Sequence, residues 1–81
     1  MAMSYGEKAV GLTFNPSGDE NVDKIKKLYA EIIDLCNDKR QVKELSEERA
    51  IGSERNRLFS IAITEAQAAQ MWAVKAITWR D

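Results

Sequence analysis

Residues 57–78 read RLFSIAITEAQAAQMWAVKAIT, and this stretch decides the fold. It contains neither Pro nor Gly, and its apolar residues recur at alternating spacings of three and four. That periodicity is typical of a helix packed against another helix. Small residues in such a row let two helix axes approach closely, so the stretch predicts a long helix with a tight seam. The seam consists of Phe59, Ala62, Ala66, Ala69, Ala73 and Ala76.

Further apolar rows lie beside this seam, which indicates more than one neighbouring helix. One row holds Ile63, Gln70 and Ile77, and another holds Leu58, Glu65, Trp72 and Trp79. The chain has 81 residues, of which 44% are hydrophobic. A chain of this size buries only about 60–65% of its unfolded surface, so its core is small. We therefore expect a homo-oligomer rather than a lone monomer.

A second helix is expected over residues 20–37, before the long one. Pro16, Ser17 and Gly18 precede it; Ser17 or Asp19 can cap it, and Ser17 with Glu20 has the spacing of a capping box. An apolar stripe follows at helical spacing, and it contains Val22, Ile25, Leu28, Tyr29, Ile32, Leu35 and Cys36. We expect Cys36 to be a small core residue.

These segments predict an all-α fold, a helical hairpin forming one domain over residues 1–81. Residues 1–19 form an arm that Gly and Pro make irregular, and Ala9 to Phe14 could be extended. Residues 38–45 are charged and read as a linker, although Gln41 to Leu45 could be helical. The long helix is expected over 46–79, and Gly52-Ser53 could interrupt it.

The composition argues against several functions. Twelve Lys and Arg against thirteen Asp and Glu leave a net charge of −1, which does not suit generic binding of DNA or RNA. With no His and one Cys, a zinc site, an internal disulfide and His-based acid–base catalysis are excluded. We expect no metal, no cofactor and no enzymatic activity. No apolar run is long enough to cross a membrane and no signal peptide is evident, so a cytosolic protein is expected.

The junction between the arm and the first helix is the best candidate for a ligand site. A helix N-terminus offers backbone N–H groups to a phosphate, which makes Asn15 and Ser17 candidates. An aromatic ring just before it, Phe14, can stack on a base, and Lys26 lies two turns into the helix. The alternative interpretation is that Phe14 is a hydrophobic anchor and that Lys26 belongs to a solvated face.

A second candidate lies on the long helix, where Arg57 and Thr64 are seven residues apart. Two turns of helix separate them by about 10 Å along the axis. They could serve a bound anion or a symmetry axis. The alternative is an inter-subunit salt bridge for Arg57 and a hydroxyl bonded to its own helix for Thr64.

The chain resembles a known family in two segments. The first is Val22-Asp23-Lys24-Ile25-Lys26, and the second runs from Arg57 to Ala76 with Ile61-Ala62-x-Thr64, Gln67, Met71 and Val74-Lys75-Ala76. These residues resemble the small phage-encoded nucleotide sponges that counter the CBASS defence, and the related hairpin domain of anti-Thoeris sponges.

The resemblance implies a helical homo-oligomer, commonly a hexamer, that binds cyclic oligonucleotide messengers without cleaving them in the cytoplasm of the infected bacterial host. It implies a site between two protomers in which an aromatic stacks on a base and a Lys meets the phosphates, roles that fall to Phe14 and Lys26. It also implies a site for cyclic trinucleotides at three-fold contacts, with roles for Arg57 and Thr64. The arm departs from the family pattern, because Phe14 stands nearer the Lys and replaces a Tyr; Tyr5 is the alternative stacking residue.

Other functions stay open. The anti-Thoeris relatives bind cyclic ADP-ribose isomers, which is a second class of ligand for the same chemistry. A helical adaptor that docks a partner helix would need the same apolar faces. A small hydrolase is the least favoured, because no catalytic group stands out in the sequence.

Overall fold

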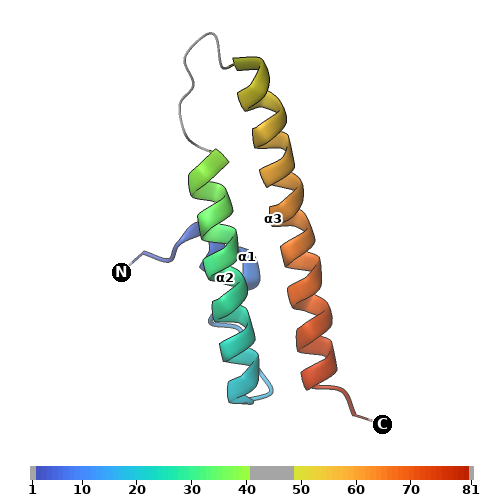
Figure 1. Ribbon diagram of the computed structural model, residues 1–81. Coiled ribbons are helices and arrows are strands. Elements are labelled where there is room, and N and C mark those ends of the chain that lie inside the picture. The colour runs from blue at the N-terminus through green and yellow to red at the C-terminus, as the bar shows by residue number, and fades with distance from the viewer. Residues whose placement is uncertain (1, 41–48, 81) are drawn as a thin grey trace.

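The structure is a hairpin of two long helices with a short helix beside it. The computed structural model describes residues 2–40 and 49–80. Its elements are α1 (Tyr5–Val10), α2 (Glu20–Arg40) and α3 (Arg49–Ile77). The two long helices run side by side, and α1 packs mainly against α2 (Figure 1). All elements of the described ranges are helical, so the expected all-α helical hairpin is confirmed.

The bounds of the long helices differ from the expected ones. α2 continues through residues 38–40, which were expected in a linker. The Arg40 side chain explains the extension, since it donates to Asn37 Oδ1 at 3.0 Å and to Ser60 Oγ on α3 at 2.9 Å. α3 is helical through Gly52 without a break and ends at Ile77. The expected start at 46 and the alternative helix over 41–45 lie outside the described residues.

The N-terminal arm contains a short helix, so the extended segment considered from Ala9 is not formed there, and the arm is irregular only outside Tyr5–Val10. Ser4 and Glu7 form a capping box at the start of α1, and Gly11 ends the helix in the left-handed conformation at φ 63°. The capping box expected for Ser17 with Glu20 is not formed. Ser17 Oγ instead accepts from the Asp19 amide, and Glu20 pairs with Lys24 at 3.7 Å.

Contacts with α2 hold α1 in place, because six residues are too few for a stable helix on their own. The Asp34 carboxylate accepts from Ser4 Oγ and from the Gly6 amide, both at 2.6 Å. Gly6 is buried against α2 so closely that a Cβ at this position would overlap the Ala30 carbonyl oxygen. Glycine at position 6 thus permits the close packing of the two helices.

The core lies between the three helices and is small. Its buried residues are Val10, Ala30, Ile33, Ile63 and Ala66. The row that begins at Ile63 and continues to the buried Gln70 faces inward, whereas Ala62 and Ala76 of the expected seam are exposed. The α2-facing side is thus centred one residue later than the alanine row, although Ala66 of that row is buried in the core, and a seam that packs against another protomer stays a prediction.

Large apolar side chains remain exposed on the outer faces of both long helices. On α2 they are Leu28, Ile32 and Leu35, and on α3 they include Leu58, Ile61, Met71 and Trp72. The expected self-association would cover such faces, and it stays a prediction. Within the described ranges, neither long helix is apolar enough to span a membrane.

Gly6→Ala should separate α1 from α2, because the added methyl group meets backbone that cannot move aside cheaply. We expect a loss of about 1–3 kcal/mol in the free energy of unfolding, measured by urea denaturation. Trypsin should also cleave after Lys8 faster than in the wild type. Gly18→Ala is the control, since Gly18 has φ 73° and open space around it. The Gly18→Ala variant should be strained at position 18 but should not expose Lys8 to trypsin. Equal cleavage of both variants would contradict the role of Gly6 in packing α1 against α2.

Candidate functional site

A cavity of about 600 Å³ lies where the start of α2 meets the end of α3. These two ends lie together at one end of the hairpin (Figure 1). One wall comes from the turn before α2 and the first turns of that helix, with Phe14, Asn15, Pro16, Ser17, Asp19, Val22 and Lys26. The opposite wall comes from the last turn of α3 and the residues after it, with Val74, Ile77, Thr78, Trp79 and Arg80.

Lys26 is the most unusual residue of the cavity, because it is charged and only 5% exposed. Its ammonium group donates to the Gly11 carbonyl oxygen at 3.0 Å and to the Phe14 carbonyl oxygen. Among the described residues these acceptors are neutral, and no carboxylate forms an ion pair with Lys26. Burying a charge is costly unless a partner compensates it, so this wall suits an anion. The prediction that Lys26 belongs to a solvated face is wrong.

Phe14 lies above this ammonium group with its side chain largely exposed. The ring centroid is 5.6 Å from Lys26 Nζ, and the residue is 70% exposed. Phe14 is therefore not a hydrophobic anchor within one protomer, and an anchoring role against a second protomer stays the alternative. An exposed ring beside a buried cation can stack on a planar group of an anionic ligand.

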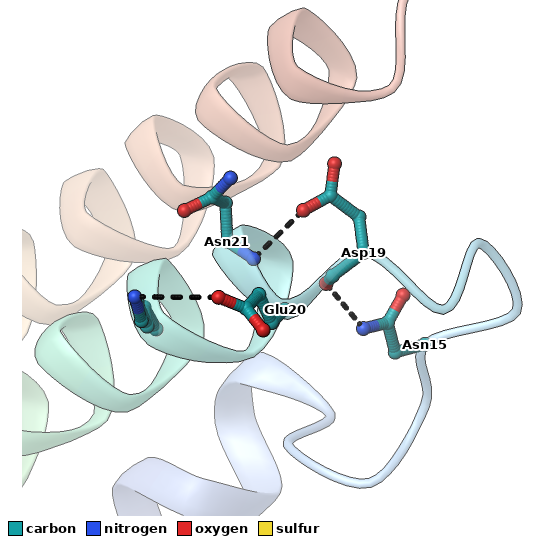
Figure 2. Close-up of polar contacts among 5 residues, drawn as sticks. Asn15, Asp19, Glu20 and Asn21 are labelled. Atoms are coloured by element: carbon teal, nitrogen blue, oxygen red, sulfur yellow. Dashed lines mark hydrogen bonds and ion pairs between the residues drawn. The ribbon is translucent and has the colours of Figure 1, made fainter.

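Asn15 and Ser17 line the cavity, but their polar groups are used to build the turn before α2. The Asn15 side-chain amide donates to the Asp19 carbonyl oxygen at 2.9 Å and to Asp23 Oδ1 at 3.0 Å (Figure 2). Ser17 Oγ donates to Asn15 Oδ1 at 2.6 Å. These two residues therefore position the wall of the cavity.

The backbone amides at the start of α2 are also used within the protein. The Asp19 amide donates to Ser17 Oγ at 3.1 Å, and the Asn21 amide donates to Asp19 Oδ1 at 2.8 Å. The Val22 amide donates to the Asp19 carbonyl oxygen at 3.1 Å. The expectation that this helix N-terminus offers free N–H groups to a phosphate is not met at these three positions.

The far wall of the cavity was not among the predicted site residues. Antiparallel packing of a hairpin places the end of the second helix beside the start of the first, and this topology could have pointed to residues 74–80. Trp79 and Arg80 add an aromatic ring and a second cation to the wall. The Lys75 ammonium group lies 5.8 Å from the Trp79 ring centroid, on the same end of α3.

The other three predicted residues lie elsewhere. Tyr5 begins α1, and its ring lies under the Arg40 guanidinium at 5.4 Å, away from the cavity. Thr64 is exposed on α3. Arg57 is exposed and forms a paired hydrogen bond with Glu54 of the same helix, at 3.0 Å and 2.9 Å. This hydrogen bond lowers the pKa of Glu54 and raises that of Arg57.

The described residues contain no group of His, Cys, Asp and Glu that could hold a metal ion. Among the described residues, the charged side chains that line the cavity are Lys26, Arg80 and Asp19. Two cations and one carboxylate thus line the same cavity, and this charge balance favours an anionic ligand.

Comparison with known families gives one match. A family model described as "Acb2/Tad1, hairpin domain" matches residues 7–78. The match covers most of the chain, including α2, α3 and every cavity-lining residue except Trp79 and Arg80. No curated protein and no solved structure matches the chain.

Lys26→Met should lower the free energy of unfolding by about 1–2 kcal/mol, because the Phe14 carbonyl oxygen loses its donor while the side chain keeps its length. Chemical denaturation measures this loss. The control is Lys24→Met, whose ammonium group is exposed and pairs with Glu20. That variant should stay within about 0.5 kcal/mol of the wild type. Equal stability of the two variants would show that Lys26 does not hold the turn.

Proposed function

Because the chain belongs to the Acb2/Tad1 hairpin-domain family, we propose that it is a phage immune-evasion sponge for cyclic di- and trinucleotide messengers. Family membership supports a general role in sequestering cyclic nucleotides rather than in catalysis. The proposed sponge binds the messenger without cleaving it, in the cytoplasm of the infected bacterial host, and so blocks CBASS-type defence.

The buried ammonium group of Lys26 is the observation that carries this proposal. It lies in a cavity of about 600 Å³, within the range of small-molecule sites. A phosphate of the ligand would give Lys26 the charged partner that its two carbonyl contacts do not. The exposed Phe14 ring is in reach of the same group and suits a base next to that phosphate. The cavity thus places a ring that can stack on a base beside a cation that can bind a phosphate.

We propose that self-association completes the site. The Phe14 ring is 70% exposed, so one protomer leaves it largely open to solvent. A ligand buried between two protomers would be held more tightly than one on an open surface, because charge-assisted hydrogen bonds strengthen when water is excluded. The exposed apolar faces of α2 and α3 provide surface for a homo-oligomer, which we propose to be a hexamer.

Arg57 and Thr64 are proposed as a second site, for cyclic trinucleotides at a three-fold contact. Both side chains are exposed on α3. Glu54 holds the Arg57 guanidinium in the protein alone, so a phosphate bound there must displace or share that partner. The ion pair between Arg57 and Glu54 is exposed and therefore weak, so replacing Glu54 by a phosphate costs little free energy.

Calorimetry with cyclic di- and trinucleotides and with cyclic ADP-ribose isomers tests the proposed function. We expect at least one of the cyclic oligonucleotides to bind far more tightly than 100 μM, which corresponds to about 5.5 kcal/mol. Chromatography of the released ligand should recover it intact. Binding of cyclic ADP-ribose isomers alone would favour anti-Thoeris activity, and binding of none of them would favour a protein adaptor.

Lys26→Met should weaken binding of a cyclic dinucleotide by about tenfold or more, because one charge-assisted hydrogen bond contributes about 1.5–3 kcal/mol. Lys24→Met should bind as the wild type does. The measurement is made well below both unfolding temperatures, so that the stability loss of Lys26→Met does not enter. Unchanged affinity in Lys26→Met would refute the role of this residue.

Arg57→Ala should weaken binding of cyclic trinucleotides and spare cyclic dinucleotides, because Arg57 lies outside the cavity that contains Lys26. Titration of both ligand classes against the one variant measures this. Equal loss of affinity for both classes would show that the two-site assignment is wrong.

A further inference from the structure

Asp19 is a carboxylate in the wall of a cavity that otherwise suits an anion. It lines the cavity together with Lys26 and Arg80. A carboxylate repels phosphate, so a bound nucleotide must present some other group to it. Since an ionised carboxylate accepts hydrogen bonds and donates none, that group must be a donor.

The Asp19 side chain has acceptor capacity left for such a donor. Oδ1 accepts from the Asn21 amide at 2.8 Å and so caps α2. Figure 2 shows the second carboxylate oxygen pointing away from Asn21, with none of the drawn contacts ending on it. Each carboxylate oxygen has two acceptor sites. No residue in the described ranges donates to Oδ2, and Oδ1 can accept a second bond.

Among the common bases, guanine best matches two acceptors side by side. Its Watson–Crick edge carries the N1–H and the 2-amino group as adjacent donors, which can bond both oxygens of one carboxylate. The corresponding edge of adenine presents an acceptor at N1, which the carboxylate would repel. Phe14 lies in the same wall and can stack on the base that Asp19 contacts.

We propose that Asp19 selects guanine in the ligand by accepting from the N1–H and the 2-amino group. This inference rests on the proposed function, since it takes the cavity to hold a cyclic nucleotide. Asp19 acts as a specificity-determining residue, while Lys26 binds the phosphate whichever base is present. The site would then favour messengers that contain at least one guanine.

The neighbouring acid, Glu20, provides a matched control. Its carboxylate pairs with Lys24 at 3.7 Å, and it extends along α2, whereas the second oxygen of Asp19 points in a different direction (Figure 2). Its side chain is 83% exposed, and it is not part of the cavity wall. Glu20→Gln therefore removes one negative charge at the same helix end without touching the proposed contact.

The test compares three probes by calorimetry: cyclic di-GMP, cyclic di-IMP and cyclic di-AMP. Hypoxanthine, the base of cyclic di-IMP, keeps the N1–H and lacks the 2-amino group. We expect the wild type to bind cyclic di-GMP about tenfold or more tightly than cyclic di-IMP, equivalent to about 1.4 kcal/mol. Cyclic di-AMP should bind more weakly still.

Asp19→Asn should reduce the preference for cyclic di-GMP over cyclic di-IMP to about threefold or less. Asn caps a helix as well as Asp does, so the variant should keep the fold, which circular dichroism checks. Asp19→Ser also retains a cap and serves if Asp19→Asn does not fold. Glu20→Gln should keep the preference of the wild type.

Each other outcome overturns the inference. If the wild type shows no preference for cyclic di-GMP, Asp19 does not read the base. If Asp19→Asn changes the affinity for all three probes by the same factor, Asp19 acts through its charge or through the ribose. If the wild type binds none of these or other cyclic nucleotides, the proposed function fails and the inference fails with it.

Discussion

The buried ammonium group of Lys26 is the contact on which the candidate site depends. It joins the Gly11 and Phe14 carbonyl oxygens to α2, and so fixes the turn that carries the exposed ring. Burying a cation without a charged partner costs free energy. Among the described residues, the hydrogen-bond partners of the Lys26 ammonium group are two neutral carbonyl groups. The same interaction therefore shapes the wall and leaves it suited to an anion.

The long helices could be predicted from the sequence, because their apolar periodicity extends over many turns. α1 could not, because six residues carry too little pattern and their stability comes from tertiary contacts with Asp34 and Ala30. The sequence did not show which face of α3 packs against α2, since a run rich in Ala marks several faces as apolar. Ile63 and Gln70, which are larger, decide which face turns inward.

The candidate site also has one part that could be predicted from the sequence and one part that could not. One wall of the site could be predicted, because its residues are close in sequence and lie around the predicted start of a helix. They are Phe14, Asn15, Ser17 and Lys26. The wall from Val74 to Arg80 depends on where the hairpin folds back, which spacing within one helix does not show. The roles of Asn15 and Ser17 also differ from the expectation, because their polar groups bond the turn itself.

The cavity has its two walls on elements that meet only at the end of the hairpin, one before and within α2 and one at the end of α3. A ligand held between them would act as a non-covalent cross-link across that end. Because a folded-state ligand adds RT ln(1 + [L]/Kd) to stability, saturation at 100 times Kd would contribute about 2.7 kcal/mol. A chain with so small a core would then be most stable with its ligand bound. Any change that raised the affinity for the ligand would also raise the free energy of unfolding of the bound protein.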